Sequence, residues 1–461
     1  MRDILEIKDE INSLDKETRK VRLRRAVNGL RKIEEASASL FCERGDAIHT
    51  AIVCIITGTH HLQYGPPGTA KSMLTRFLNK TIENSTYFET LLTKSSDEAQ
   101  LFGPYSLKGL ENDEYRRNTD GKVPEANLIF VDEVYKSNSA VLNALLSVMN
   151  EKIYHNGPDI MNLPLITMFG ASNEIPEEDS SLEALHDRFL MRIYVDDIKD
   201  PANMIAVYRS NLNNDFEGMD LPAVDVEDIF LLNEYSKKVR ISDYLLQEYS
   251  KLIISLRNQG IRISTRRQIM LLHAVQGEAL LKKRNEAQLD DFGVIRNGLW
   301  RKLEELPAID EALTKFISPY ETQYNEIINK FKELKRDYEQ ITGADAESNI
   351  KMTKLINKMS DLGNQVRDYG SINKAMPKAM AQSFSKLYKE ITYYTEKYYE
   401  AQDKDLLDLS PRSNKSGRRS GQSSGSDIVR SSSAAHINKT GAIDDIEESF
   451  DNDDNDPDWM V

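Results

Sequence analysis

The segment Gly65–Ser72, which reads Gly-Pro-Pro-Gly-Thr-Ala-Lys-Ser, constrains the fold of this chain more than any other feature. It follows the short strand-like run His61–Tyr64 and precedes a helix that is predicted to begin at Lys71. In a loop of this kind, backbone N–H groups turn inward at the amino end of a helix and bind phosphate oxygens. A lysine then reaches the β- and γ-phosphates, and a hydroxyl binds Mg²⁺. A strand, a phosphate loop and a helix in this order predict an α/β fold with a parallel sheet.

The ligands predicted for this loop are ATP and Mg²⁺. Lys71 is the cation expected to reach the phosphates, and Ser72 supplies the hydroxyl on the metal side. Ala70 stands before the lysine, where glycine is usual; alanine is small and tolerates helical dihedral angles, so the loop is expected to close. A chance loop of the same composition is the alternative. We assign nine residues to nucleotide binding: Gly65, Pro66, Pro67, Gly68, Thr69, Ala70, Lys71, Ser72 and Met73.

Two adjacent carboxylates follow a buried-strand pattern about sixty residues after the phosphate loop. The run Leu128–Val131 is apolar and leads directly to Asp132 and Glu133. A parallel strand would bring both side chains to the carboxyl edge of the sheet, where nucleotides bind. We therefore expect Asp132 to hold Mg²⁺ and Glu133 to activate the water that attacks the γ-phosphate. The alternative is an acid pair on a solvated strand end.

Three further polar residues complete the predicted catalytic set. Asn173 follows a strand-like run and can hydrogen-bond the attacking water or the γ-phosphate, although a turn-forming asparagine has the same pattern. Arg188 precedes the last predicted strand and is expected to stabilise transition-state charge in a neighbouring subunit. A surface ion pair with Asp187 is the alternative for this arginine. Arg266 begins a helix in a second domain and is expected to lean back onto the phosphates, with Arg267 as the second choice.

The composition is that of a soluble, largely globular chain. Among 461 residues, 40% are hydrophobic and 29% are charged, and neither a membrane span nor a leader peptide is expected. Cys42 and Cys54 lie in apolar helical surroundings, which is typical of a protein of the reducing cytoplasm. The net charge of −14 disfavours binding to nucleic acid, which needs clustered positive charge. Much of this negative charge lies in residues 444–458, which hold nine acids and no Lys or Arg.

Strand-like and helical runs alternate up to residue 198, as in a parallel sheet covered on both faces. A helix is predicted over Ala47–Thr57, with Asp46 as its cap and Gly58 as its stop signal. From Pro201 helical patterns take over, as in a small helical lid. The remaining strand-like runs are Leu165–Phe169 and Met191–Val195.

Three heptad patterns of apolar residues follow, with breaks at Gly343 and at Gly370 and Pro377. Consecutive heptad helices with short breaks are best satisfied by folding back as an antiparallel three-helix coiled coil. The alternative is that each seam binds a different partner or packs on the preceding domain. The seams contain Ile317, Tyr320, Tyr324, Ile327, Phe331, Leu334, Tyr338 and Ile341, then Met352, Leu355, Met359, Leu362, Val366 and Tyr369, and finally Met380, Phe384, Leu387, Ile391, Tyr394 and Tyr398.

These patterns divide the chain into five parts. The predicted parts are an N-terminal helical lead at 1–29, an α/β nucleotide-binding domain at 30–198, a helical lid at 199–285, a coiled-coil domain at 286–402, and a disordered serine-rich linker with an acidic tail at 403–461. The tail, which contains Trp459, is expected either to dock into a basic groove or only to keep the chain soluble.

Taken together, the motifs resemble those of the MoxR family of AAA+ ATPases, with the RavA-like branch as the nearest match. The matching segments are Gly65–Ser72, Phe130–Lys136, Gly170–Pro176 and Leu182–Arg188, with Cys42–Ile48 before the first strand. The resemblance covers about residues 20–280. It implies an αβα AAA+ core with a helical lid, a homo-oligomeric ring expected to be a hexamer, and chaperone-like remodelling with a von Willebrand factor A-domain partner.

The same resemblance implies roles for individual residues. Asn173 corresponds to sensor 1, Arg188 to the arginine finger and Arg266 to sensor 2. It also implies two inserts that face a central pore, at residues 102–123 and 154–163.

The leading hypothesis is therefore a cytoplasmic enzyme that converts ATP and water to ADP and phosphate in a ring and remodels or activates a protein partner. A nucleotide-gated binding scaffold is the alternative from a different class. A nucleic-acid motor is a third hypothesis, which the net acidity disfavours.

Overall fold

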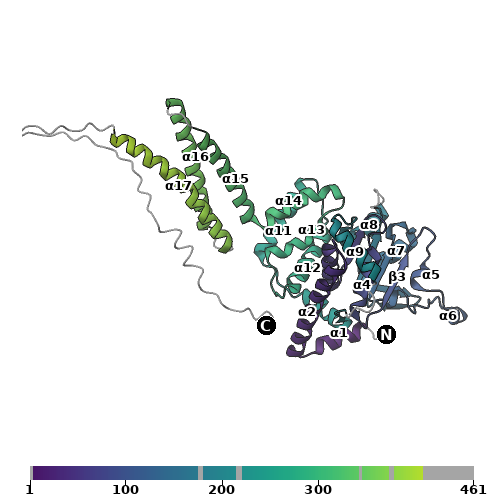
Figure 1. Ribbon diagram of the computed structural model, residues 1–461. Coiled ribbons are helices and arrows are strands. Elements are labelled where there is room, and N and C mark those ends of the chain that lie inside the picture. Colours follow the sequence, from purple (N-terminus) through teal and green to yellow (C-terminus); the bar gives the residue numbers. More distant parts are fainter. Residues whose placement is uncertain (1–3, 175–179, 214–220, 342–344, 373–377, 409–461) are drawn as a thin grey trace, which may run out of the picture. The chain divides into compact units, whose positions relative to one another are not determined.

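The computed structural model describes residues 4–174, 180–213, 221–341, 345–372 and 378–408 of the 461-residue chain. The chain divides into two compact units, whose described parts are residues 4–317 (unit 1) and 318–408 (unit 2), as Figure 1 shows. The acidic tail that the sequence analysis predicts lies outside the described residues.

A five-stranded parallel sheet forms the centre of unit 1, with its strands in the order β3-β4-β7-β1-β8. Strand-like runs in the sequence predicted four of these strands. Edge strand β3 was not predicted, because it is only partly buried and its five residues, Tyr-Phe-Glu-Thr-Leu, contain no continuous apolar run. The strands are β1 His60–Tyr64, β3 Tyr87–Leu91, β4 Leu128–Asp132, β7 Thr167–Ser172 and β8 Phe189–Tyr194.

Alternate side chains of the sheet enter two separate hydrophobic cores, as expected for strands covered on both faces. In β4, Leu128 and Phe130 enter one core, whereas Ile129 and Val131 enter the other. The first core contains side chains of α2 Lys16–Leu40, α3 Gly45–Thr57 and α4 Lys71–Lys80, and the second contains side chains of α5 Glu98–Phe102, α7 Ser139–Glu151 and α8 Ser180–Arg188. Unit 1 therefore has the predicted αβα arrangement.

Helix α3 agrees with the predicted helix and its stop signal but not with its predicted cap. Gly58 adopts a left-handed conformation with φ of 65°, and its N–H donates to the carbonyl oxygen of Cys54. The helix begins at Gly45, so Asp46 lies inside the first turn and the prediction that it caps the helix is wrong. Its carboxylate can still interact favourably with the positive end of the helix dipole.

Helices and short turns follow the sheet and form the lid. Residues 286–317, which the sequence analysis assigned to the next domain, pack in unit 1 instead, because Phe292, Trp300 and Ile309 are buried in its first core. The elements after the sheet are α9 Pro201–Asn213, β9 Val224–Asp225, α10 Val226–Ser236, α11 Asp243–Asn258, α12 Thr265–Leu281, η3 Leu289–Ile295, α13 Arg296–Leu299, η4 Leu303–Glu305 and α14 Leu306–Ile317.

Smaller elements complete unit 1. The second predicted insert is an antiparallel hairpin, and the rings of Phe102 and Tyr154 stack at 4.7 Å between the two inserts. Across the described ranges, no helix is both long and apolar enough to cross a membrane. These elements are α1 Ile4–Ser13, β2 Ile82–Glu83 (paired with β9), α6 Leu107–Glu111, η1 Val123–Glu125, η2 Val134–Lys136, β5 Ile153–Asn156 and β6 Asp159–Asn162.

Unit 2 is an antiparallel bundle of three helices: α15 Pro319–Gln340, α16 Ala346–Ile372 and α17 Lys378–Asp408. Tyr320 near the start of α15 contacts Tyr369 near the end of α16, with ring centroids 6.3 Å apart. Thr353 near the start of α16 hydrogen-bonds Tyr398 of α17 at 2.8 Å. Each helix therefore runs opposite to the one before it, as predicted.

The heptad seams meet in one core shared by the three helices. The apolar seams therefore pack against one another within unit 2. The alternative, in which each seam binds a different partner or packs on the preceding domain, does not hold for these seams. Three predicted seam residues, Ile317, Ile341 and Met352, lie outside this core. Ile356, which is fully buried in it, was not predicted.

Candidate functional site

The phosphate loop joins β1 to α4 and takes left-handed backbone conformations at three positions. The φ angles are 150° at Gly65, 84° at Gly68 and 69° at Ala70. A Cβ at Gly65 would lie 2.1 Å from the carbonyl oxygen of Val195, so only glycine fits there. The expectation that Ala70 keeps ordinary helical angles is wrong. The left-handed region costs an L-residue steric strain, which explains why glycine is usual at this position.

The other loop residues differ in exposure. Thr69 is buried and donates its hydroxyl to the carbonyl oxygen of Pro66 at 2.9 Å, whereas Pro67, Gly68 and Met73 are exposed. Among the described residues, none caps the amino end of α4 with a side chain, and its first turn carries no acid. The N–H groups of this turn are therefore available to an anion.

Lys71, the first residue of α4, is held over the loop by three hydrogen bonds. Its Nζ donates to the carbonyl oxygens of Gly65 and Pro66, both at 2.8 Å, and to Oδ1 of Asn173 at 3.0 Å. The last of these bonds joins the phosphate loop to the end of a neighbouring strand.

Asp132, Glu133 and Asn173 lie at the same sheet edge as Lys71, because β4, β7 and β1 are neighbours and end together. Asn173 accepts from Lys71 and donates its Nδ2 to Oε1 of Glu133 at 2.6 Å. Burial lowers the pKa of Lys71 below its ordinary value, and the carboxylates of Asp132 and Glu133 act in the opposite direction. The structure therefore brings four of the predicted residues into one cluster.

Glu133 is held in an unusual conformation. Its φ of 52° is left-handed, and Oε1 also lies 3.3 Å from Nζ of Lys136. The second oxygen, Oε2, is buried and meets no hydrogen-bond partner within the described ranges. A carboxylate oxygen in this state can accept a proton from a bound water.

The predicted metal ligands, Ser72 and Asp132, stand at the start of α4 and the end of β4. Asp132 Oδ1 accepts the N–H of Glu133 at 2.9 Å. In the part of the chain that the structure describes, no group of three or more His, Cys, Asp or Glu could hold a metal ion. One hydroxyl and one carboxylate suit Mg²⁺, which retains water and takes further ligands from phosphates.

Arg188 lies at the opposite edge of the sheet. It ends α8, and the next residue, Phe189, pairs with His60 at the amino end of β1. Strand β1 is five residues long, so its amino end, next to Arg188, lies roughly 15 Å along the strand from the phosphate loop at its carboxyl end. Asp187 comes only to 4.0 Å from the Arg188 guanidinium, a marginal ion pair. The Nε of Arg188 is buried without a partner among the described residues.

Arg266 lies near Arg188, and the structure does not bring it to the phosphate loop of its own chain. Its Nη2 donates to Oδ1 of Asn150 at 2.5 Å. The carbonyl oxygen of Met149, one residue earlier, is 3.1 Å from Nε2 of His60, which places this contact at the amino edge. Burial lowers the pKa of Arg188, and the charge of Arg266 lowers it further.

Arg267, the second choice for this role, is a buried structural residue. Its side chain is 3% exposed. The guanidinium donates to the carbonyl oxygens of Asp187 at 3.2 Å, Phe189 at 3.1 Å, Leu190 at 2.5 Å and Gly298 at 2.6 Å. It thus ties α12 to the start of β8 and to α13.

A hydrogen bond between Tyr135 and His186 was not predicted from the sequence. Tyr135 Oη and His186 Nδ1 are 2.5 Å apart. Tyr135 is two residues after Glu133, and His186 is two residues before Arg188, so the bond connects the segments that carry these side chains. Burial lowers the pKa of His186 well below its usual range, so the ring is neutral. Only the packing of α8 beside η2 brings the pair together.

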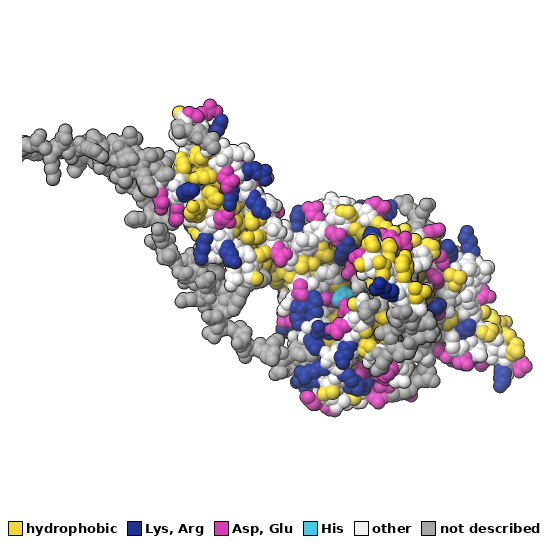
Figure 2. Space-filling view, in the orientation of Figure 1, with side chains coloured by type: hydrophobic (Ala, Val, Ile, Leu, Met, Phe, Trp, Pro, Cys, Tyr) yellow, Lys and Arg dark blue, Asp and Glu magenta, His cyan; other side chains and the backbone are white. Residues whose placement is uncertain are grey.

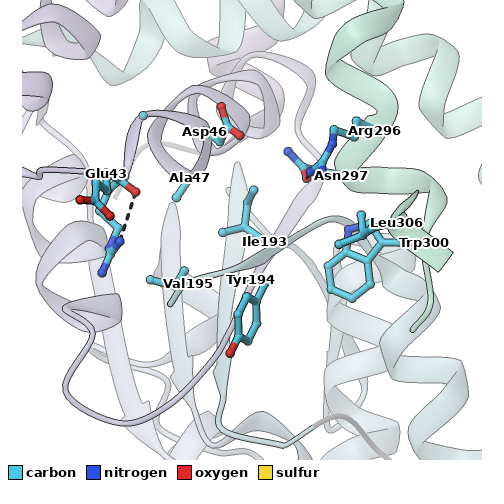
Figure 3. Close-up of a pocket in the computed structure, with 12 residues that line it drawn as sticks. Glu43, Asp46, Ala47, Ile193, Tyr194, Val195, Arg296, Asn297, Trp300 and Leu306 are labelled. Carbon is cyan, nitrogen blue, oxygen red and sulfur yellow. Dashed lines mark hydrogen bonds between the residues drawn. The ribbon is translucent and has the colours of Figure 1, made fainter. Parts of the chain in front are cut away.

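A cavity of about 470 Å³ adjoins the phosphate loop (Figure 3). Val195, whose carbonyl oxygen lies against Gly65, is part of its lining. The cavity is bounded by the segment before α3, the end of β8 and the segment from α13 to α14, and Figure 3 shows Glu43 and Arg296 on opposite sides of it. This volume suits a small ligand. Its lining includes Glu43, Asp46, Ile193, Tyr194, Arg296, Trp300 and Leu306.

Two family models match the chain. Residues 28–232 match the MoxR domain in the MoxR-vWA-beta-propeller ternary systems, and residues 230–313 match an AAA lid domain. Two uncharacterized proteins of Methanocaldococcus jannaschii are 36% identical to it. MJ0812 aligns over 339 residues (72% of this chain, 89% of that protein), and MJ0079 aligns over 316 residues (68% and 80%). The chain belongs to the MoxR family of AAA+ ATPases.

A viral protein and a solved structure extend the comparison. Structural protein ORF618 of Acidianus two-tailed virus is 28% identical over 213 residues, which are 45% of this chain and 34% of that protein. The crystal structure of a candidate ATPase from Cytophaga hutchinsonii matches with a TM-score of 0.54 and 22% identity, covering 65% of this chain and 97% of that one. This structural likeness shows the fold alone.

Family membership agrees with the α/β core and lid of unit 1 and implies that this MoxR-family chain binds a nucleotide. The RavA-like branch stays a prediction, as do the roles of the individual site residues.

Proposed function

We propose that this MoxR-family chain hydrolyses ATP in a homo-oligomeric ring, expected to be a hexamer, and couples hydrolysis to the remodelling or activation of a protein partner. One observation carries the proposal: Lys71 lies at the carboxyl edge of the sheet, whereas Arg188 and Arg266 lie at the amino edge. One chain cannot bring all three cations to the same nucleotide. A head-to-tail ring, in which each amino edge faces the carboxyl edge of the next chain, can do so.

The nucleotide would lie across the phosphate loop and the adjoining cavity. Lys71 would exchange its bonds to the loop carbonyls for bonds to the β- and γ-phosphate oxygens. The adenosine would enter the cavity beside Tyr194 and Trp300. Ser72 and Asp132 would hold Mg²⁺, which neutralises phosphate charge when bound.

Glu133 is proposed as the general base. Its Oε2 would accept a proton from water as the water oxygen bonds to the γ-phosphorus. The bond from the γ-phosphorus to the β–γ bridging oxygen breaks, which releases ADP and phosphate. Asn173 holds the other oxygen of Glu133 and would orient this carboxylate and the water.

Arg188 and Arg266 would act on the nucleotide of the neighbouring copy. They form a pair of neighbouring cations, and the one carboxylate that Arg188 meets within the described ranges is a marginal partner at 4.0 Å. The terminal phosphate of a neighbour would relieve this repulsion and bring both guanidinium groups to the charge that develops during hydrolysis.

The partner is proposed to be a protein with a von Willebrand factor A domain. The matching family model describes MoxR domains from systems that also contain a vWA component. The two inserts of unit 1, around α6 and the β5–β6 hairpin, are proposed to face the pore of the ring.

Hydrolysis measured against chain concentration tests the ring. The rate per chain should rise with concentration, and Arg188→Ala should abolish hydrolysis while nucleotide binding is retained. Arg31→Ala, which removes an exposed arginine of α2, is the matched control and should behave as wild type. Full-rate hydrolysis by a monomer would refute the proposal.

A separate experiment tests the partner. Glu133→Gln should bind ATP without hydrolysing it and retain the partner in an affinity purification with ATP. Equal recovery of a vWA-domain protein with and without nucleotide would argue against a coupled cycle.

A further inference from the structure

Helix α9 presents an apolar face that is exposed among the residues the structure describes. Ile205, Tyr208 and Leu212 are 49%, 61% and 84% exposed. Their spacing of three and four residues places them on one side of the helix. None of the α9 side chains that the structure describes is buried, and hydrophobic side chains gather around α9 in Figure 2. Single exposed apolar residues are common, but three on one helix face mark a surface that binds another molecule.

The beginning of α9 is fixed beside the nucleotide cavity. Glu43 accepts the N–H groups of Lys199 and Asp200, each at 3.0 Å, and the Nδ2 of Asn203 at 2.9 Å. The bond from Asn203, with the two backbone bonds, lowers the pKa of Glu43 to about 2, so its carboxylate is charged at neutral pH. Glu43 also lines the cavity. The helix therefore starts at the carboxyl edge of the sheet and is held by a residue of the cavity wall.

We propose that the α9 face, defined by Ile205, Tyr208 and Leu212, docks a second copy of this chain. The inference rests on the proposed ring. If Arg188 acts on the nucleotide of a neighbour, a second copy must cover the carboxyl edge, and α9 begins at this edge. An apolar helix face beside the nucleotide would give the neighbouring copy a contact that excludes water from the edge of the nucleotide site.

The same arrangement links docking to the nucleotide. Glu43 borders the cavity and anchors α9, so a ligand in the cavity acts on the residue that orients the docking helix. Assembly is therefore expected to be tighter with nucleotide than without it.

The experiment compares the full chain with Tyr208→Glu and Leu212→Glu by sedimentation velocity, with and without a slowly hydrolysed ATP analogue. A carboxylate in an apolar contact removes the burial of a large side chain, so each substitution should raise the dissociation constant of assembly at least about tenfold. Both residues are exposed, so melting temperatures should not change. Ile254→Glu, at a 53% exposed position of α11, is the matched control and should assemble as wild type.

Hydrolysis and nucleotide binding separate the possible outcomes. The α9 variants should bind a fluorescent ADP analogue as wild type does, and recover hydrolysis only at higher concentration. If they assemble like wild type while wild-type hydrolysis depends on concentration, the docking face is wrong and the ring stands. If Ile254→Glu weakens assembly as much as they do, α9 has no special role and the inference fails. If wild type hydrolyses at full rate as a monomer, the proposed function itself fails.

Discussion

Replacing Arg267 with methionine is expected to destabilise unit 1 by about 3–5 kcal/mol. The buried guanidinium donates to four backbone carbonyl oxygens, and each buried acceptor left without a donor costs about 1–3 kcal/mol. The net loss of stability is smaller than the sum of four such costs for two reasons. Burial lowers the pKa of Arg267 well below its usual range, which shows that the charge is costly to bury, and the substitution removes this cost. The four carbonyl groups are also neighbours and can relax together, so their costs do not add.

The adjacent residue provides the contrast. Arg266 is exposed and donates to Asn150, so Arg266→Ala should change the free energy of unfolding by no more than about 0.5 kcal/mol. Because Arg266 is proposed to act on the nucleotide of a neighbour, this variant should lose at least about tenfold in hydrolysis by the assembled protein. Arg267→Lys keeps the charge but loses the forked donor geometry, so its stability should be intermediate.

Urea unfolding followed by tryptophan fluorescence measures these differences. Trp300 is fully buried in unit 1, and the other tryptophan, Trp459, can be replaced by phenylalanine to leave a single reporter. Arg267→Met should lower the unfolding midpoint without changing the slope. Wild-type stability of Arg267→Met, or a large loss of stability in Arg266→Ala, would refute the assignment of the two arginines.

Three further substitutions test other parts of the chain. Ala70→Gly should raise the free energy of unfolding by up to about 1.6 kcal/mol, because it relieves about 1–2 kcal/mol of left-handed strain against about 0.4–1 kcal/mol of chain entropy; a lower urea midpoint would contradict this. Burial alone would lower the pKa of His49, but hydrogen bonds to Glu278 and Glu34 raise it to about 10. Protonated His49 therefore stabilises the fold fully below about pH 6.5, and this contribution is lost as the pH rises through 10. The stability difference between wild type and His49→Gln, on the order of 2 kcal/mol for a partly exposed group, should shrink over that range, and a pH-independent difference would oppose the account. Ile356→Ala should destabilise unit 2 by about 2–5 kcal/mol in thermal unfolding by circular dichroism and leave the Trp300 signal of unit 1 unchanged.

Much of the fold was accessible to prediction, because it depends on residues that are close in sequence. Strand-like runs predicted four strands of the central sheet, and heptad spacing predicted the order of the three helices of unit 2. The misses occur where local spacing is ambiguous. In α16 the heptad pattern selected Leu355, which is partly buried, and passed over its neighbour Ile356, which is fully buried. The edge strand β3 contains no continuous apolar run.

The sequence by itself determined that a strand, a phosphate loop and a helix follow one another, and that Lys71, Asp132, Glu133 and Asn173 can share one sheet edge. Strand direction and loop hydrogen bonding depend on contiguous residues, so such patterns are visible in one dimension.

Only the tertiary structure decided the hydrogen bond between Tyr135 and His186 and the different positions of Arg266 and Arg267. Each of these depends on segments that are distant in sequence and come together by packing. Two adjacent arginines look alike in a sequence. Arg267 is buried among four carbonyl groups of α8, β8 and α13, whereas Arg266 is exposed and donates to Asn150 of α7, because successive residues of a helix point in different directions.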